Sequence, residues 1–229
     1  MTKFAFFDFD KTLYDGFSTI DFYLLMAENG WWDKAVYQED QKLRDDFLIK
    51  HYSYDEISLK VIELGIRLLK GFSRQQILEM EDQFSQMSLK FYPYVYPLIH
   101  RLNQEGFISY IISAATFPPV EAVGRELKMP FFASTAKMTG HTYTGELKLF
   151  LNGEAKRQKI QEILKDAAQP TFSLGFGDST GDLPLLETTN QGFVINPHQE
   201  EMKEMAKQRG YILTDADHIV SEVEKALKP

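Results

Sequence analysis

Short apolar runs that alternate with helical patterns limit the fold of this chain more than any other feature. Residues 3–9 read Lys-Phe-Ala-Phe-Phe-Asp-Phe, and similar runs lie at 107–112, 171–176 and 192–195, with a shorter one at 130–133. Strands that are apolar on both faces belong in a parallel sheet covered by helices on both sides. Helical patterns separate them, at residues 94–104, 118–127, 154–166 and 182–188. This alternation predicts an α/β fold with a doubly wound parallel, Rossmann-like sheet.

Residues 15–91 interrupt this alternation. Their apolar positions recur at helical spacing, as in Ile57, Val61 and Leu64. Because one crossover does not need so long a helical stretch, we expect residues 15–91 to form an inserted helical cap domain. The α/β core would then comprise residues 1–14 and 92–229. Residues 138–149 alternate and carry turn residues, which predicts a small hairpin.

Composition narrows the partners and the compartment. The 229 residues contain no cysteine and carry a formal net charge of −8. An acidic chain lacks the basic face that nucleic acids and acidic membranes select, so we expect neither partner. No stretch approaches the roughly 18 apolar residues that span a bilayer. Without a signal-peptide pattern at the N-terminus, and without cysteine, we expect a cytoplasmic protein.

The first candidate motif is Asp8-Phe9-Asp10-Lys11-Thr12, at the end of the first predicted strand. Two carboxylates after a buried strand repel each other and resist desolvation unless a cation or hydrogen bonds stabilise them. The alternative is an exposed turn in which one aspartate caps a helix.

The second candidate motif runs from Phe176 to Asp182 and reads Phe-Gly-Asp-Ser-Thr-Gly-Asp, again after a buried strand. Asp182 could simply cap the helix that follows. However, ligands of parallel sheets bind beyond the carboxyl ends of strands, where the strand order reverses. If the strands that carry Asp8 and Asp178 flank that point, three or four carboxylates converge there, and hard oxygen ligands in that number suit Mg²⁺.

Two further residues could complete a site for an anion. Ser113 ends the predicted strand before Ala114, so its hydroxyl and the following N–H could hold an anion oxygen, although it could also begin a helix. Lys156 lies at a predicted helix start, where a cation is unfavourable unless an anion is bound nearby. Most lysines are solvated surface residues, so Lys156 alone indicates little.

In this order the motifs resemble those of the haloacid dehalogenase-like (HAD) superfamily. The correspondence comprises Asp-x-Asp-x-Thr after the first strand, Ser after the second, Lys before a helix, and Gly-Asp-x-x-x-Asp after a later strand. It covers residues 1–14 and 92–229. The helical insertion directly after the first motif resembles the C1-type cap of the phosphoserine-phosphatase-like branch (subfamily IB).

This resemblance implies a Mg²⁺-dependent phosphatase that acts on a small phosphorylated metabolite through an aspartyl-phosphate. Asp8 would be the nucleophile and Asp10 the general acid and base. The resemblance also implies the remaining roles, which are metal ligation by Asp8, the Asp10 carbonyl and Asp178, phosphate or substrate binding by Thr12, Ser113, Ala114 and Lys156, and support of Lys156 or a metal-bound water by Asp182.

The identity of the substrate stays open at this point. Phosphoserine phosphatases carry an acidic residue shortly after the first motif, whereas this chain has Phe17 or Ser18 there, depending on alignment, so phosphoserine is doubtful. A phosphotransferase or phosphomutase would share every catalytic residue. A binding-only homologue and a phosphorylatable switch fit less well, because all four motifs are present and a receiver domain has no large cap.

Overall fold

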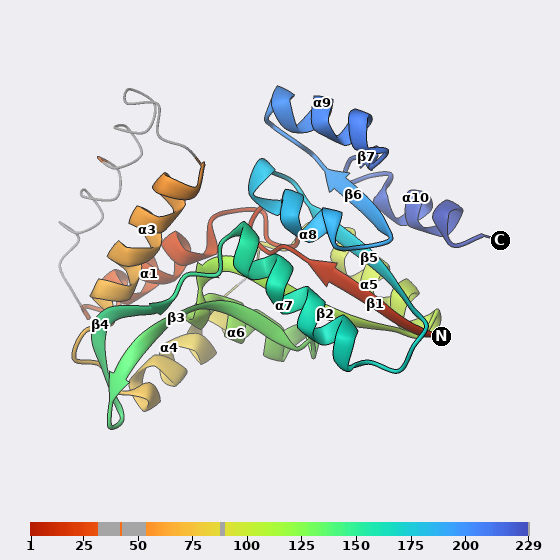
Figure 1. Cartoon of the computed structure of the whole chain (residues 1–229). Coiled ribbons are helices and arrows are strands. Elements are labelled where there is room, and N and C mark those ends of the chain that lie inside the picture. Colours follow the sequence, from red (N-terminus) through yellow and green to blue (C-terminus); the bar gives the residue numbers. More distant parts are fainter. Residues whose placement is uncertain (32–41, 43–53, 88–89, 229) are drawn as a thin grey trace. The chain divides into compact units, whose positions relative to one another are not determined.

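The computed structural model describes residues 1–31, 42, 54–87 and 90–228 (Figure 1). The chain forms two compact units. Unit 1 comprises Met1–Asp15, Lys90–Ile112 and Gly153–Pro229, and unit 2 comprises Gly16–Leu89 and Ser113–Asn152. The cap boundaries expected from the sequence, at residues 15 and 91, remain a prediction.

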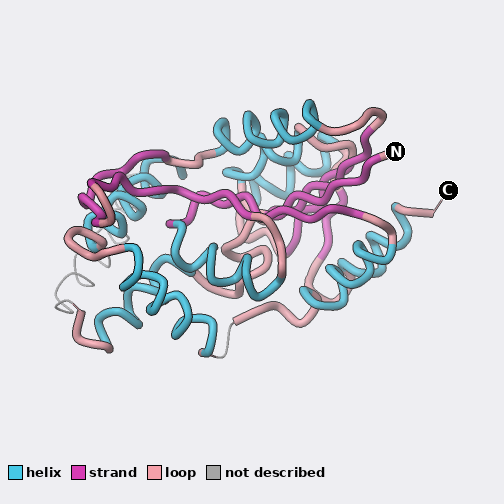
Figure 2. The backbone as a smooth tube through the Cα atoms, turned by 90° about the horizontal axis from the view of Figure 1, so that it is seen from below, coloured by secondary structure: helices cyan, strands magenta, loops and turns pink. Residues whose placement is uncertain are grey.

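Unit 1 is built on parallel strands. Strand β1 (Thr2–Phe7) lies between β2 (Phe107–Thr116) and β5 (Thr171–Gly177), and β6 (Gln191–Ile195) and β7 (Ile212–Thr214) follow beyond β5. Every one of these pairings is parallel. Figure 2 shows helices on both faces of these strands. The predicted Rossmann-like parallel sheet is therefore confirmed.

The helices of unit 1 follow the predicted alternation. They are α5 (Val95–Gln104), α7 (Gly153–Asp166), the short 3₁₀ helix η1 (Thr180–Asp182), α8 (Leu183–Glu187), α9 (Glu200–Arg209) and α10 (Ile219–Ala226). The strands that follow β1 in the sequence are added first on one side of it, beginning with β2, and later on its other side, beginning with β5. The order of the strands thus reverses at β1, which is where a ligand is expected beyond the carboxyl ends.

Aromatic side chains account for the central position of β1. The side chains of Phe6 and Phe7 are completely buried, one on each face of the strand. Phe7 stacks on Phe176 of β5 with ring centroids 4.3 Å apart, and Phe176 stacks on Phe193 of β6 at 5.0 Å. A strand with no polar face is most stable when helices cover both of its faces, so that neither face is exposed to solvent.

Strand β2 is longer than predicted, because it continues to Thr116 instead of stopping before Ser113. Helix α6 (Phe117–Leu127) agrees with the helix predicted at 118–127, and Pro118 and Pro119 lie in its first turn. Proline suits that turn because its missing N–H has no helical partner there. Helix α9 and strand β7 were not predicted, since α9 buries only Met202 and Ala206 and β7 has three residues.

Unit 2 combines helices with one hairpin. It contains α1 (Ser18–Glu28), α3 (Tyr54–Leu68), α4 (Arg74–Gln86) and α6, together with β3 (Phe131–Thr139) and β4 (Thr142–Leu149). Strands β3 and β4 pair antiparallel, which confirms a hairpin over residues 138–149. Its first strand begins at Phe131, so the short run at 130–133, predicted as a separate strand of the parallel sheet, is the beginning of this hairpin strand. Trp32, Arg44 and Lys50, within the predicted cap, lie outside the described residues.

Within the described residues, unit 2 buries the carboxylate of Glu81. The Glu81 side chain is fully buried on α4, where Arg74 Nη1 lies 2.6 Å from its Oε1 and Arg125 Nη1 of α6 lies 3.3 Å from its Oε2. A buried carboxylate needs such partners to offset the loss of water. These ion pairs join α4 to α6.

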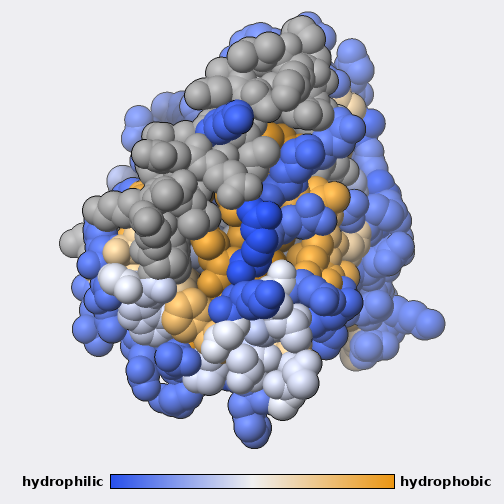
Figure 3. All heavy atoms as spheres, turned by 90° about the vertical axis from the view of Figure 1, so that its left-hand side faces the viewer, coloured by the Kyte–Doolittle hydropathy of each residue, from blue (hydrophilic) through white to orange (hydrophobic). Residues whose placement is uncertain are grey.

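Within the part of the chain that the structure describes, no helix is both long and apolar enough to cross a bilayer. Figure 3 shows one face of the molecule, which is largely hydrophilic and has a smaller area of apolar side chains.

Close packing at Gly65 generates a stability prediction. A Cβ added at Gly65 of α3 would lie 2.5 Å from the ring of Tyr23, which is 6% exposed. Alanine improves helix propensity by about 1 kcal/mol, but overpacking a buried ring costs about 1–3 kcal/mol. We therefore expect Gly65→Ala to lower the free energy of unfolding by about 1 kcal/mol in urea titrations. Lys60→Ala, at an exposed position of the same helix, is the control, and a Gly65→Ala protein as stable as this control would contradict the expected clash.

Candidate active site

Asp8 is the first residue after β1. Its backbone N–H donates to the carbonyl of Phe176 on β5 at 2.9 Å, so the neighbouring strand fixes the start of the loop. Its carboxylate belongs to a residue that is only 7% exposed. Strand β1 is apolar on both faces, and Asp8 follows it directly at its carboxyl end.

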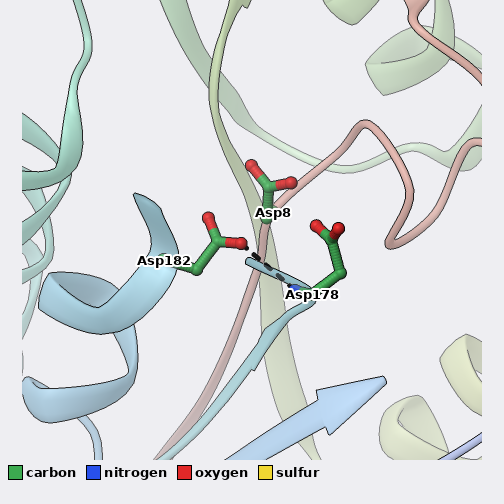
Figure 4. Close-up of side chains that lie close together, drawn as sticks. All are labelled: Asp8, Asp178 and Asp182. Carbon is green, nitrogen blue, oxygen red and sulfur yellow. Dashed lines mark hydrogen bonds between the residues drawn. The ribbon is translucent and has the colours of Figure 1, made fainter. Parts of the chain in front are cut away.

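Asp178 follows the carboxyl end of β5 in the same way. Because β1 and β5 are parallel neighbours, their ends lie at one edge of the sheet, and Asp178 comes close to Asp8. One carboxylate oxygen from each of Asp8, Asp178 and Asp182 lies within 4.8 Å of the other two (Figure 4). The predicted convergence of the first and last motifs is thus present in the structure.

Lys156, near the start of α7, places an ammonium group between two of these carboxylates. Its Nζ lies 2.6 Å from Asp8 Oδ1 and 2.7 Å from Asp182 Oδ1. The residue is only 3% exposed, unlike the solvated surface lysine that the alternative reading requires. Lys156 is therefore part of the buried charge cluster.

Asp182 is committed to protein contacts. Its Oδ1 accepts from Lys156, and its Oδ2 accepts from the N–H groups of Asp178 at 3.1 Å and Ser179 at 3.2 Å and from Ser179 Oγ at 3.1 Å. Gly177 permits this approach, because a Cβ there would lie 2.5 Å from the Cβ of Asp182. Asp182 thus holds Lys156 and the Asp178 loop in place. Its carboxylate is better suited to that work than to binding a metal.

The charges in this cluster do not balance. Three buried carboxylates face one ammonium group. Burial raises the pKa of Asp8 from 3.8 to about 7, and repulsion from Asp182 adds to the effect. Burial likewise raises the pKa of Asp178, followed by repulsion from Asp182 and from Asp8. A divalent cation that binds Asp8 and Asp178 would restore the balance, and these oxygens are the hard ligands that Mg²⁺ prefers.

The loop after Asp8 is tight. The carbonyl of Phe9 accepts from the N–H groups of Thr12, Leu13 and Tyr14 at 2.8–3.2 Å. Lys11 has φ +63°, in the left-handed region that glycine favours. Asp10 is half-buried and forms a backbone bridge with Tyr14.

Thr12 is fully buried in this loop. Its Oγ1 has no hydrogen-bond partner among the described residues. An orphaned buried hydroxyl is rare enough to need an explanation, and a substrate oxygen would supply one.

The structure does not bring all predicted residues into one unit. Asp8, Asp10, Thr12, Lys156, Asp178 and Asp182 belong to unit 1, whereas Ser113 and Ala114 begin the second part of unit 2. Ser113 is buried and its Oγ accepts from the N–H of Ala115 at 3.1 Å, while the Ala114 carbonyl accepts from Ser134 Oγ at 2.7 Å. Their part in phosphate binding stays a prediction.

Sequence reasoning missed two residues that contact this region. Ser179 pairs with Asp182 in a capping box, which the Ser-x-x-Asp spacing could have revealed. The Tyr94 hydroxyl donates to the carbonyl of Thr12. No sequence pattern signals that second contact, because it joins side chain and backbone across 82 residues.

Comparison with known proteins gives consistent matches. Residues 5–187 match the model of the haloacid dehalogenase-like hydrolases. The "Inhibition of morphological differentiation protein" of Streptomyces azureus is 26% identical over 219 residues, which cover 92% of this chain and 77% of the relative. A "Probable phosphatase" of Mycobacterium tuberculosis is 24% identical over 217 residues, which cover 90% and 73%.

Solved structures share the fold. A protein of unknown function from Bordetella pertussis superposes with a TM-score of 0.78 at 20% identity, covering 94% of this chain and 99% of the other. A phospho-aspartyl intermediate analogue of phosphoserine phosphatase superposes with a TM-score of 0.67 at 17% identity, covering 99% of each chain. At these identities the likeness establishes the common fold.

The charge imbalance generates a prediction for the metal-free protein. The pKa values of Asp8 and Asp178 are raised on folding, so folding favours their protonated forms. The associated stability is present at low pH and is lost as the pH rises through about 7. Asp178→Asn removes one of the repelling charges. We therefore expect this variant to have a higher Tm than the wild type in EDTA at pH 8, with a smaller difference at pH 5.

Thermal unfolding followed by circular dichroism at the two pH values measures this difference. The control is Asp217→Asn, an exposed aspartate of unit 1 outside the cluster. A wild type that is more stable than Asp178→Asn at pH 8 without metal would show that the carboxylates do not repel each other as described.

Proposed function

The chain belongs to the haloacid dehalogenase-like hydrolases, and from this premise we propose that it is a Mg²⁺-dependent phosphatase that cleaves a small phosphomonoester through an aspartyl-phosphate on Asp8. The observation that carries the proposal is the buried Asp8 carboxylate, held 2.6 Å from Lys156 and close to Asp178 at the end of the sheet. The names of the mycobacterial relative and of the phosphoserine phosphatases with the same fold point the same way.

Asp8 is the proposed nucleophile. Its carboxylate oxygen attacks phosphorus, the bond from phosphorus to the ester oxygen breaks, and an acyl phosphate forms on Asp8. Lys156 favours the charged carboxylate in a site where burial opposes it. Splitting the reaction in this way replaces one hard displacement by two easier ones.

Asp10 is the proposed general acid and base. It gives its proton to the departing alkoxide in the first step and takes a proton from the attacking water in the second, so it ends as it began. Asp10 follows the nucleophile by two residues, and the hydrogen bonds within residues 9–14 restrict the backbone around it. Such proton transfer typically contributes about a hundred- to ten-thousand-fold in rate.

The remaining residues are proposed to bind the phosphoryl group and the metal or to orient groups that do. Lys156, Ser113, the N–H of Ala114 and Thr12 bind phosphoryl oxygens, and Asp182 orients Lys156 through a 2.7 Å contact. Asp8, the Asp10 carbonyl and Asp178 would hold Mg²⁺, which when bound offsets the repulsion between carboxylates and draws charge from the phosphoryl group. Phosphoryl transfer depends mainly on such positioning and charge neutralisation.

Phe17 or Ser18, depending on alignment, stands where phosphoserine phosphatases carry an acidic residue. Phe17 precedes α1 and is 52% exposed, Ser18 is buried, and neither has a charge with which to bind a substrate amine. We therefore propose that the substrate is a small phosphorylated metabolite other than phosphoserine. Release of inorganic phosphate in a screen of metabolite phosphates, with no second phosphorylated product, separates hydrolysis from phosphoryl transfer to an organic acceptor.

The nucleophile assignment is tested by Asp8→Asn. We expect turnover of p-nitrophenyl phosphate to fall by at least about a thousandfold, because an amide cannot form the acyl phosphate. EDTA should abolish the wild-type activity, and added Mg²⁺ should restore it. Asp217→Asn is the matched control. Full activity of Asp8→Asn, or of the wild type in metal-free buffer, would refute the mechanism.

The acid role of Asp10 is tested by the choice of leaving group. For an alkyl phosphate, Asp10→Asn should lower kcat by about a hundredfold or more, since a poor leaving group needs the proton. For p-nitrophenyl phosphate, whose phenolate leaves without help, formation of the acyl phosphate should suffer much less. Burst kinetics separate this step from hydrolysis of the intermediate. Equal losses for both substrates in the first step would exclude Asp10 as the acid.

A further inference from the structure

The side chain of one buried tyrosine, Tyr94, contacts the tight loop of residues 9–14. Tyr94 immediately precedes α5 and is 3% exposed, and its hydroxyl donates to the backbone carbonyl of Thr12. Both residues belong to unit 1. A rigid helix of the core is thereby connected directly to the loop that carries Asp10 and Thr12.

This loop needs external support. Lys11 adopts φ +63°, a conformation that costs a residue with a side chain about 1 kcal/mol or more. The loop also contains no glycine that would make the turn easy. Strained backbone persists only where the surroundings determine it, and here the returning chain provides that support.

Residues 90–94 contact the loop along its length. The N–H of Asp15 donates to the carbonyl of Lys90 at 2.6 Å, and the N–H of Tyr92 donates to the carbonyl of Leu13 at 3.3 Å. Tyr14 and Phe91 form an antiparallel bridge between them. Among these contacts, the Tyr94 hydroxyl is the side-chain donor that reaches the carbonyl of Thr12 itself.

The chemistry of Tyr94 suits a permanent donor. Burial raises its pKa, and Tyr92, Asp178 and Asp15 add to the shift, so the phenol stays neutral across the assay range. Its ring stacks on Tyr92 with centroids 5.5 Å apart and planes inclined by 10°, which restricts its orientation.

Thr12 is consequently fixed at both backbone groups. Its N–H donates to Phe9 at 3.2 Å and its carbonyl accepts from Tyr94, while its buried Oγ1 has no partner among the described residues. A hydroxyl with no protein partner on a backbone held this firmly is prepared to meet a ligand oxygen.

We propose that Tyr94 is a positioning residue, whose hydroxyl holds the Thr12 carbonyl and so keeps Asp10 and Thr12 in the geometry that phosphoryl transfer requires. The inference rests on the proposed phosphatase activity. Asp8, Asp178 and Lys156 are placed by β1, β5 and α7 and do not depend on this contact. Loss of the hydroxyl should therefore impair the chemical step more than substrate binding.

The test is Tyr94→Phe, which removes only the hydroxyl. With p-nitrophenyl phosphate and Mg²⁺ we expect kcat about tenfold lower and KM within about twofold, because a buried carbonyl loses its donor and the loop relaxes. Tyr96→Phe is the control, since Tyr96 lies two residues later, in the first turn of α5, and is 53% exposed. Activity is expressed per folded molecule, from circular dichroism at the assay temperature, so partial unfolding does not count as lost catalysis.

A double-mutant cycle distinguishes positioning from general stabilisation. Thr12→Val removes the hydroxyl that Tyr94 is proposed to place. If Tyr94 acts through Thr12, the fall in kcat of the double variant is clearly smaller than the product of the two single falls. If Tyr94 only stabilises the fold, Tyr94→Phe lowers Tm and leaves kcat per folded molecule within twofold of the wild type.

That last outcome, or a fall in the double variant equal to the product, would overturn the inference while the phosphatase mechanism stands. A wild type that releases no phosphate from any substrate would instead overturn the proposed function, and this inference with it.

Discussion

The candidate site depends on the ion pairs that Lys156 forms with two carboxylates. The lysine ammonium group lies 2.6 Å from Asp8 and 2.7 Å from Asp182, and all three groups are almost fully buried. Burying two carboxylates this close together is unfavourable without a cation between them. β1 supplies Asp8, the turn after β5 supplies Asp182, and α7 supplies Lys156. The parallel pairing of β1 with β5 is what brings these distant parts of the sequence to one point.

Much of this arrangement could be predicted from the sequence, because it follows from strand topology. A strand such as β1, apolar on both faces, belongs in the interior of a parallel sheet, and Asp8 and Asp178 follow two such strands at the edge where ligands bind. Lys156 was harder to recognise, since a lysine at a helix start is usually solvated. Only its partners, invisible in a local pattern, distinguish it from an ordinary surface residue.

The features that escaped prediction depend on tertiary contacts. Helix α9 has a weak apolar face, and it becomes recognisable only when Met202 and Ala206 are seen to be buried. Strand β2 extends past Ser113 to Thr116 and α6 begins at Phe117, so the alternative in which Ser113 begins a helix is wrong. The contact of Tyr94 with Thr12 joins positions 82 residues apart and leaves no periodic trace.

The same charges that define the site make it unfavourable for the folded chain. Lys156 offsets part of the repulsion, yet the pKa of Asp8 remains near 7 and that of Asp178 is also raised. A core selected for stability alone would replace such carboxylates by apolar residues. Three donors from its own turn hold Asp182 in place, and Gly177 leaves room for this approach. The carboxylates are therefore held together at this position although their repulsion destabilises the folded chain. In the proposed mechanism a bound cation and a phosphoryl group would together offset that destabilisation, since the cation would neutralise Asp8 and Asp178 while Lys156 and Thr12 would receive the anion.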